Sequence, residues 1–270
     1  MEGLVGQEWD EREAHTKLTQ LILLLCLPTF LVLQFVIPAP WGKLLPSTEK
    51  IGPLLNPRLA WIFFESPNLI WSFICFTRRN PDLFPSSIFH LNANSILLGL
   101  FVGHYIHRNL IYPFRIKPNS NKMPLLVVVS GFAFCAINGY IQAQSICQYR
   151  QYPPGYHQSP RFLLGVAVFL AGFLINVHSD SILVNLRKDG ETGYKIPHGA
   201  CFEYVSGANH FGEMIEWTGF AIASSSLPAL VFLAYTCSNL IPRAVAHHRW
   251  YKQKFEDYPK ERKAVIPFVL

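Results

Sequence analysis

The chain has few charged residues and lacks the short motifs by which many soluble enzymes hold nucleotides. Charged residues make up 15% of its 270 positions and hydrophobic residues 50%, a balance that is unusual for a soluble domain. There is no G-x-G-x-x-G turn and no G-x-x-x-x-G-K-[ST] loop, so a nucleotide would have to bind without a Rossmann turn or a P-loop. The absence of a G-x-S-x-G elbow argues against an acyl-transferring serine.

The cysteines and histidines are too dispersed for a disulfide framework or a metal centre. No two of the six cysteines form a C-x-x-C pair, and four of them lie in apolar runs, where a free cysteine packs as a small hydrophobic residue. The closely spaced histidines are His104 with His107, and His247 with His248. Two such pairs supply too few ligands for a membrane di-iron centre, so we predict that no metal is bound.

Apolar sequence is what the chain has in abundance. Several runs approach the roughly 20 residues that cross a bilayer, and the acidic N-terminus does not resemble a cleavable signal peptide. We predict an all-α, polytopic membrane protein with a single domain over residues 1–270 and seven transmembrane helices. The expected spans are about 17–38, 53–75, 89–113, 122–146, 161–186, 202–224 and 227–250.

The distribution of basic residues orients these spans. If the C-terminus is cytosolic, 16 of the 23 lysines and arginines fall in inner segments and six in outer ones. The positive-inside rule therefore predicts a cytosolic C-terminus and an outer N-terminal segment of about residues 1–16. Because the basic residues are scattered over separate short loops, we expect no nucleic-acid partner.

Polar side chains nevertheless recur inside the apolar chain, above all between Asn176 and Trp217. Charged residues within a membrane are costly and indicate a functional site by default. At helical spacing they form three stripes: Tyr105, Arg108 and Tyr112; Asn176, Asp180 and Arg187; and Asn209, Glu213 and Glu216. Further polar residues end the last span, and Glu65 stands alone in the second.

These groups either lock helices together or line a cavity. Interhelical polar contacts in membranes are typically worth under about 2 kcal/mol each, and one pair would suffice for locking. The larger set favours a polar cavity, and the surplus of basic residues at its cytosolic side suits an anionic ligand.

Several motifs closely resemble those of the steroid 5α-reductase family. They are I-N-V-H-S-D (175–180), G-Y-K-I-P (193–197), Y-V-S-G-A-N (204–209), G-E-M-I-E-W (212–217), H-H-R-W-Y (247–251) and the ending F-E-D-Y-P-K-x-R-K-A-V-I-P-F. The resemblance covers about residues 55–270, and L-x-x-L-R-K with E-Y-V is most similar to the type 1 group of that family.

The resemblance implies a seven-helix enzyme of the endoplasmic reticulum membrane, with a lumenal N-terminus. It would transfer hydride from NADPH to C5 of a 3-oxo-Δ4-steroid such as testosterone or progesterone, which would come from the lipid phase. Residues of about 115–270 would carry most of the NADPH-binding part, open to the cytosol. Membrane lipid would surround the chain, and no obligatory protein partner is implied.

Site residues are implied by the same resemblance. Glu65 and Tyr105 would contact the steroid 3-oxo group as the catalytic pair, with Trp61 and Phe64 beside them. The family often has glutamine where Phe64 stands, which bears on substrate preference. The cofactor-binding residues implied are Arg108, Tyr112, Asn176, Asp180, Arg187, Tyr194, Asn209, Glu213, Arg243, His247 and Tyr251.

The chemistry explains why such a pair is needed. A C=C bond accepts hydride when negative charge can move to a conjugated carbonyl oxygen, so the site must stabilise that oxygen with donors. We expect Glu65, among Trp61, Phe63 and Phe64, to be protonated and to donate together with Tyr105. Two alternatives remain: a reductase of another conjugated lipid, such as a polyprenal or a 2-enoyl thioester, and a non-catalytic sterol-binding membrane protein.

Overall fold

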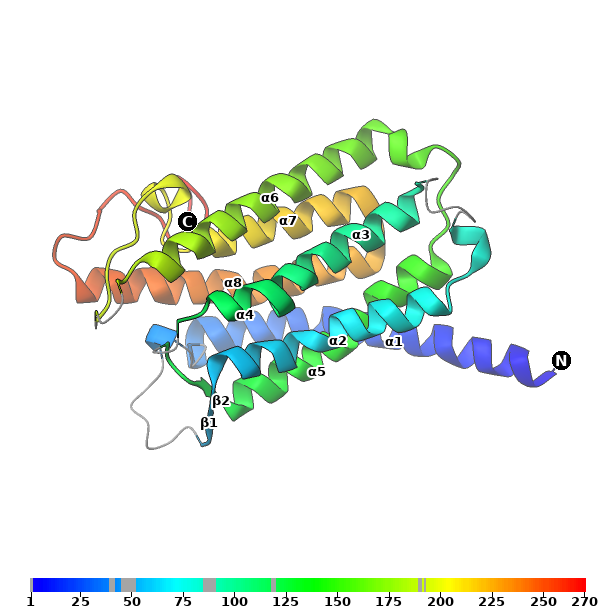
Figure 1. The fold of residues 1–270 in the computed structure, drawn as a ribbon, viewed down its shortest axis with the longest axis horizontal. Coiled ribbons are helices and arrows are strands. Elements are labelled where there is room, and N and C mark those ends of the chain that lie inside the picture. The colour runs from blue at the N-terminus through cyan, green and yellow to red at the C-terminus, as the bar shows by residue number, and fades with distance from the viewer. Residues whose placement is uncertain are drawn as a thin grey trace.

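The computed structural model is an elongated bundle of long helices (Figure 1). It describes residues 2–38, 42–44, 52–84, 91–117, 120–188, 191 and 193–270, with side chains from residue 10 onward. The α-helices are α1 (Glu2–Leu31), α2 (Pro57–Thr77), α3 (Ala93–Ile106), α4 (Tyr112–Arg115), α5 (Leu125–Gln144), α6 (Pro160–Asn185), α7 (Ala208–Ser224) and α8 (Leu227–Lys254). The two termini lie at opposite ends of the bundle.

Short turns extend or connect these helices. Among the described residues, the π-helical turns are η1 (Val32–Val36), η5 (His107–Ile111) and η6 (Ser145–Tyr149). The 3₁₀-helical turns described are η2 (Gly42–Leu44), η4 (Pro81–Leu83), η7 (Tyr156–Gln158) and η8 (Ala200–Glu203). A small antiparallel sheet, which the sequence analysis did not predict, pairs β1 (Leu54–Leu55) with β2 (Met123–Pro124).

Helix starts follow from local sequence. Asn56, Ser159 and Ser226 each accept a backbone hydrogen bond through the side chain, and a proline follows within the first two helical positions of α2, α6 and α8. Such caps satisfy amides that have no partner inside the helix. Asn92 and Ser95 form a reciprocal capping box at the start of α3, which fixes where that helix begins.

Five helical segments in the described part of the chain are long and apolar enough to cross a membrane. They are Asp10–Val36, Pro57–Thr77, Leu125–Tyr149, Pro160–Asn185 and Leu227–Lys254. They coincide with five of the predicted spans, and the protein is an all-α membrane protein. The other two predicted spans, 89–113 and 202–224, contain the shorter helices α3, of 14 residues, and α7, of 17; residues 89 and 90 lie outside the described residues.

The two shorter helices have identifiable ends. The α-helical register of α3 stops at Ile106, where η5 widens the helix before α4 resumes. α7 begins at Ala208 instead of near residue 202, because η8 and a bridge between Val205 and Lys263 hold the preceding segment outside the helix. The predicted boundary of that span was therefore about six residues too early.

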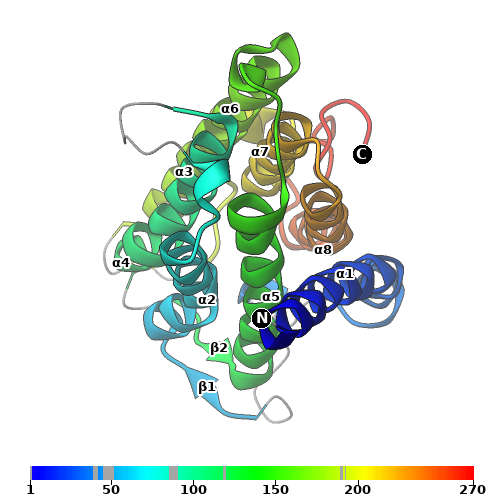
Figure 2. The same ribbon diagram turned by 90° about the vertical axis from the view of Figure 1, so that its right-hand side faces the viewer.

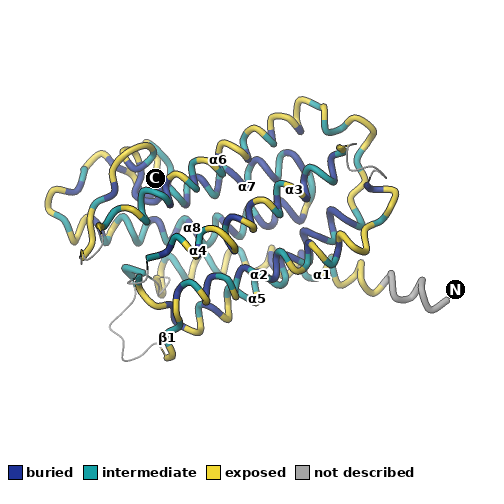
Figure 3. Tube along the Cα trace, viewed as in Figure 1, coloured by how far each residue is buried: buried dark blue, intermediate teal, exposed yellow. Residues whose placement is uncertain are grey.

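The helices associate in close pairs, seen end-on in Figure 2. α6 packs along α7, α2 along α5 and α1 along α8, while α3 lies beside both α2 and α7. α7 is largely buried, whereas the outward turns of α1 and α6 are exposed (Figure 3). Exposed apolar side chains on those turns are expected where the solvent is lipid.

Glycines bring α6 and α7 into backbone contact. A Cβ atom added to Gly172 would lie 2.2 Å from the backbone N of Glu216, and one added to Gly212 would lie 2.5 Å from that of Asn176. Gly165 and Gly219 make equally close approaches further along the same two helices. Small residues let membrane helices approach in this way, and the contact places the polar side chains of α6 and α7 opposite each other.

Candidate active site

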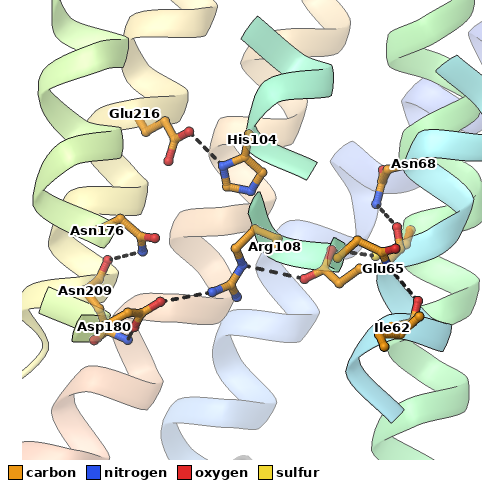
Figure 4. Close-up of polar contacts among 11 residues, drawn as sticks. Ile62, Glu65, Asn68, His104, Arg108, Asn176, Asp180, Asn209 and Glu216 are labelled. Atoms are coloured by element: carbon orange, nitrogen blue, oxygen red, sulfur yellow. Dashed lines mark hydrogen bonds and ion pairs between the residues drawn. The ribbon is translucent and has the colours of Figure 1, made fainter. Parts of the chain in front are cut away.

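Arg108 lies between an acid of α2 and an acid of α6 (Figure 4). Its Nη1 donates to Asp180 Oδ2 at 3.2 Å, and its Nε lies 3.8 Å from Glu65 Oε1. All three side chains are almost wholly buried: 11% of the Arg108 side chain is exposed, 9% of Glu65 and 2% of Asp180. A buried charge needs such partners to offset its lost hydration.

A π-helical turn presents Arg108 to both acids. The residue belongs to η5 (His107–Ile111), and widened turns of this kind are frequent at functional sites. Its guanidinium lies over the rings of Trp61 and Tyr112, with the carbon Cζ 4.7 and 5.1 Å from the ring centroids. Asn109 Nδ2 donates to Ile62 O at 2.6 Å and ties the turn to α2.

A chain of amides continues from Asp180 into α7. Asn209 Nδ2 donates to Asp180 Oδ1 at 3.0 Å, and Asn176 Nδ2 donates to the backbone oxygen of Asn209, also at 3.0 Å. Asp180 thus accepts from a cation on one side and an amide on the other. Asp180 and Asn176 of the α6 stripe are thus in direct contact with Asn209 of the α7 stripe.

His104 and Glu216 form a second buried pair, and His104 lies about one helical turn before Arg108. His104 Nδ1 lies 2.7 Å from Glu216 Oε1, and both side chains are at most 2% exposed. The His104 ring also contacts Tyr105 and Trp217, at centroid distances of 4.9 and 4.6 Å. His104 therefore packs against Tyr105 while it is paired with Glu216.

The proposed catalytic pair, Glu65 and Tyr105, points into the bundle. Glu65 is 7% exposed and Tyr105 4%. The Tyr105 phenol is close enough to interact electrostatically with the carboxyl groups of Glu65 and Glu213, and the Cys135 thiol donates to Glu65 Oε2 at 3.8 Å. Trp61 is buried beside them, and its ring contacts half-buried Phe64 at 5.1 Å.

Further predicted cofactor residues join the same cluster electrostatically. Glu213 interacts with both Glu65 and Arg108, and Arg243 interacts with Glu213 and Tyr112. The acids of α2, α6 and α7 therefore interact with two arginines, and Asn209 joins the same cluster through its hydrogen bond to Asp180.

The remaining predicted residues form a second group toward the end of α8. The rings of His247 and His210 stack at 5.7 Å. Tyr251, 3% exposed, stacks on Tyr258 at 5.3 Å, and the ammonium nitrogen of Lys43 lies 3.8 Å from the centroid of the Tyr251 ring.

Arg187 and Tyr194 stand apart from the central cluster. Arg187 Nη1 donates to the backbone oxygen of Gly193, and Tyr194 is 39% exposed, with its ring against Trp250 and its hydroxyl accepting from Asn121. Both residues lie in the segment between α6 and η8. These contacts with described residues do not involve the central cluster.

Three features of the site were missed by the sequence analysis. Lys43 lies in η2, far along the chain from the family motifs, so no local pattern indicated it. The pairing of Glu216 with His104 and the glycine contact of α6 with α7 depend on helix register between elements. The regular spacing of Gly165 with Gly172 and of Gly212 with Gly219, seven residues in each case, was the available signal for that contact.

Several buried polar atoms of the cluster have no hydrogen-bond partner within the described chain. They are Arg108 Nε, Asn176 Oδ1 and Glu216 Oε2. Buried polar atoms are nearly always paired, so each such atom requires an explanation. The arrangement suits a ligand that brings both donors and acceptors.

Comparison with known proteins connects this site to a family. The family model described as 3-oxo-5-alpha-steroid 4-dehydrogenase matches residues 121–270. The chain is 46% identical to 3-oxo-5-alpha-steroid 4-dehydrogenase 1 of Rattus norvegicus over 234 residues, covering 86% of each chain. It is 44% identical to the protein of the same name from Bos taurus, covering 88% of this chain and 91% of that one. It is 43% identical to steroid 5-alpha-reductase DET2 of Arabidopsis thaliana, with coverage of 90% and 91%.

Proposed function

Because the chain belongs to the 3-oxo-5-alpha-steroid 4-dehydrogenase family, we propose that it reduces the Δ4 double bond of a 3-oxo-Δ4-steroid with hydride from NADPH. The observation that carries the proposal is the buried array of Glu65, Arg108 and Asp180, with Tyr105 beside it. It joins a polar region of α6 and α7 to an acid on α2.

Glu65 and Tyr105 form the electrophilic part of the proposed site. Hydride addition at C5 moves negative charge onto the 3-oxo oxygen, and a proton from solvent or a nearby acid then adds at C4 to complete the reduction. One preorganised donor at the oxygen is worth about 2.7–4 kcal/mol. A phenol donates at neutral pH, and a carboxyl group donates when it keeps its proton. Glu65 and Asp180 share one guanidinium, and Asp180 has the closer contact at 3.2 Å. Because Asp180 is the closer partner of the Arg108 guanidinium, Glu65 can keep its proton and donate it in a hydrogen bond.

The residues of α6, α7 and α8 fit a dinucleotide. NADPH supplies the hydride when it is bound. The unpartnered buried atoms of Arg108 and Asn176 match the acceptors and donors of its amide and hydroxyl groups. The other residues proposed to hold it are Tyr112, Asp180, Arg187, Tyr194, Asn209, Glu213, Arg243, His247 and Tyr251, with Lys43 added from the structure. The basic members suit its phosphates, including the one that NADH lacks.

Aromatic side chains keep water from the reacting atoms. Trp61, Tyr105 and Trp217 are each at most 4% exposed, and Phe64 lies beside Trp61. In such surroundings a hydrogen bond to the developing oxyanion is stronger than in water. Phe64, in place of the glutamine frequent in the family, makes this wall apolar and is proposed to influence which steroid is preferred.

The proposed setting is the endoplasmic reticulum membrane. Single-domain organisation with seven spans would put the N-terminus in the lumen and the C-terminus in the cytosol, where NADPH is available. The steroid would enter from the lipid phase, with no nucleic acid and no obligatory protein partner. Support comes from the five long apolar helices and from the bias of basic residues toward the proposed cytosolic side.

The test is a reduction assay on the purified protein in detergent. Testosterone, progesterone and androstenedione are each supplied with NADPH or NADH, and NADPH consumption and product stereochemistry are followed. We expect 5α-reduced products with NADPH. Consumption with a polyprenal or a 2-enoyl thioester, and none with any steroid, would indicate a reductase of another lipid. Sterol binding without consumption of either cofactor would indicate a binding protein.

A further inference from the structure

An apolar groove runs along the outer surface between α2 and α3. It has a volume of about 370 Å³, within the range of about 300–1,000 Å³ that small-molecule sites occupy. Its walls include Leu69, Phe73 and Phe76 of α2 and Leu98, Gly99 and Val102 of α3. We call it the α2–α3 groove.

The groove leads toward the proposed catalytic pair. Leu69 stands four residues after Glu65 on α2, and Val102 stands three residues before Tyr105 on α3. Residues three or four apart lie on one face of a helix, one turn from each other. The groove therefore ends about one helical turn from the two side chains that would meet the steroid 3-oxo group.

The walls suit a rigid, apolar ligand that arrives from lipid. Phe73 is 70% exposed and Phe76 41%, as expected for side chains that face lipid. The two serines of the groove are already bonded: Ser72 Oγ donates to Asn68 O, and Ser95 Oγ donates to Asn92 O. Gly99 contributes no side chain, so the α3 wall is open there and a flat ring system can approach the backbone.

On the opposite side of the catalytic pair, the described residues are polar. Toward the C-terminal ends of α6 and α8, the region beyond Tyr105 is occupied by Arg108, Asp180 and Asn209. Displacing these bonded polar groups with an apolar steroid would leave buried charges unpaired, which is costly. The polar side suits the cofactor, and the apolar side suits the steroid.

We propose that the α2–α3 groove is the lateral entrance through which a steroid passes from the membrane to Glu65 and Tyr105. The inference rests on the proposed function, because it takes the ligand from that reaction. The steroid enters between Phe73 and Phe76 on one side and Gly99 on the other, with its 3-oxo end leading. The groove is thus the first apolar contact of the substrate with the protein.

Two glycines of α3 provide a matched test. A Cβ atom added at Gly99 or at Gly103 meets no heavy atom of the described chain within 4 Å, and both residues are exposed. A leucine at either place raises helix propensity equally. Gly99 lines the groove, whereas Gly103, one turn further along, is not among its lining residues. Gly99→Leu would fill the entrance, and Gly103→Leu serves as the control.

The variants are compared by steroid kinetics and by NADPH binding in detergent or in vesicles. We expect Gly99→Leu to lower kcat/KM for testosterone about tenfold while the NADPH Kd stays within about twofold. Gly103→Leu should leave both values within about twofold of the parent. Equal kcat/KM in Gly99→Leu and the parent, or equal losses in both variants, would overturn the proposal.

A second measurement separates this inference from the proposed function. A photoactivatable steroid is cross-linked to the full chain, and the labelled peptides are identified. We expect label on the α2 and α3 peptides that line the groove, lost in Gly99→Leu and kept in Gly103→Leu. If the parent reduces no steroid but shows this labelling, the reaction is wrong and the groove stands. If the parent reduces steroid but these peptides carry no label, the groove is wrong and the reaction stands.

Discussion

Glu65 and Arg108 face each other across the centre of the bundle, with 3.8 Å between Glu65 Oε1 and Arg108 Nε. No hydrogen bond joins the two groups, since Arg108 Nε has no hydrogen-bond partner in the described chain. Arg108 is bonded to Asp180 on its other side. Glu65 is therefore held near the cation while its carboxyl group can still turn toward a ligand, which is what a donor to the substrate requires.

Removing the Glu65 carboxyl group should stop catalysis without removing the cofactor. Glu65→Ala deletes a proposed oxyanion donor, so kcat for testosterone should fall about 100- to 1,000-fold. NADPH titration should change little, because Asp180 and Asn209 remain bonded to each other. The control is Ser66→Ala, whose hydroxyl donates to Phe63 O on the outer side of α2. A Glu65→Ala protein with near-parental turnover would show that the electrophile is misassigned.

Asn209 should matter for cofactor affinity. In Asn209→Ala the 3.0 Å hydrogen bond to Asp180 is lost, while the backbone oxygen that accepts from Asn176 remains. We expect the NADPH Kd, measured by fluorescence titration, to rise about tenfold. Asn185→Ala is the matched control, since Asn185 is exposed and bonds to Ser181 O on its own helix. An unchanged Kd in Asn209→Ala would remove this residue from the proposed cofactor site.

The glycine contact between α6 and α7 should be sensitive to a single methyl group. In Gly212→Ala the new Cβ would lie 2.5 Å from the backbone N of Asn176, and relieving such overpacking costs about 1–3 kcal/mol. The melting temperature in detergent should fall accordingly. Gly103→Ala, where the Cβ meets nothing within 4 Å, should melt at or slightly above the parental temperature. Equal melting of both variants would mean that α6 and α7 are less tightly packed than the structure has them.

Cofactor binding should depend on the protonation of Lys43. Burial lowers the pKa of Lys43 to about 7. The free protein therefore loses this charge as the pH rises through about 7, and an anionic phosphate bound beside it must restore the proton. The NADPH Kd should rise with pH above about 7, by up to about tenfold per pH unit. Lys43→Met should bind more weakly at low pH and lose this dependence, whereas the exposed-lysine variant Lys254→Met should keep it. The same slope in Lys43→Met and the parent would contradict the assignment.

Periodicity was enough to locate the helices and to place the polar stripes, because buried acids at helical spacing stand out in apolar sequence. It did not reveal that Arg108 joins Glu65 to Asp180. That contact depends on the π-helical turn η5, whose wider register changes the direction of the side chain and leaves no mark on a 3.6-residue pattern. The family resemblance implied only that Arg108 faces the cofactor.

Contacts between helices were harder still to foresee. Gly172 and Gly212 are ordinary residues when each helix is considered alone, and their importance arises only because the two helices meet at those positions. Lys43 is separated from Tyr251 by most of the chain, and no local pattern connects them. The short β1–β2 pairing likewise depends on two distant segments that meet beside α2.

The closely packed helix pairs are expected to behave as separate rigid units. α6 and α7 touch backbone to backbone, and Gly139 of α5 lies so near α2 that a Cβ there would be 2.9 Å from Asn68 Cα. Each pair should move as a rigid body, and the two are joined by α3, which contacts α2 and α7, and by α8, which contacts α5 and α7. The proposed hydride donor would lie mainly on one pair and its acceptor on the other, so whichever ligand binds first would restrict their relative motion and favour binding of the second.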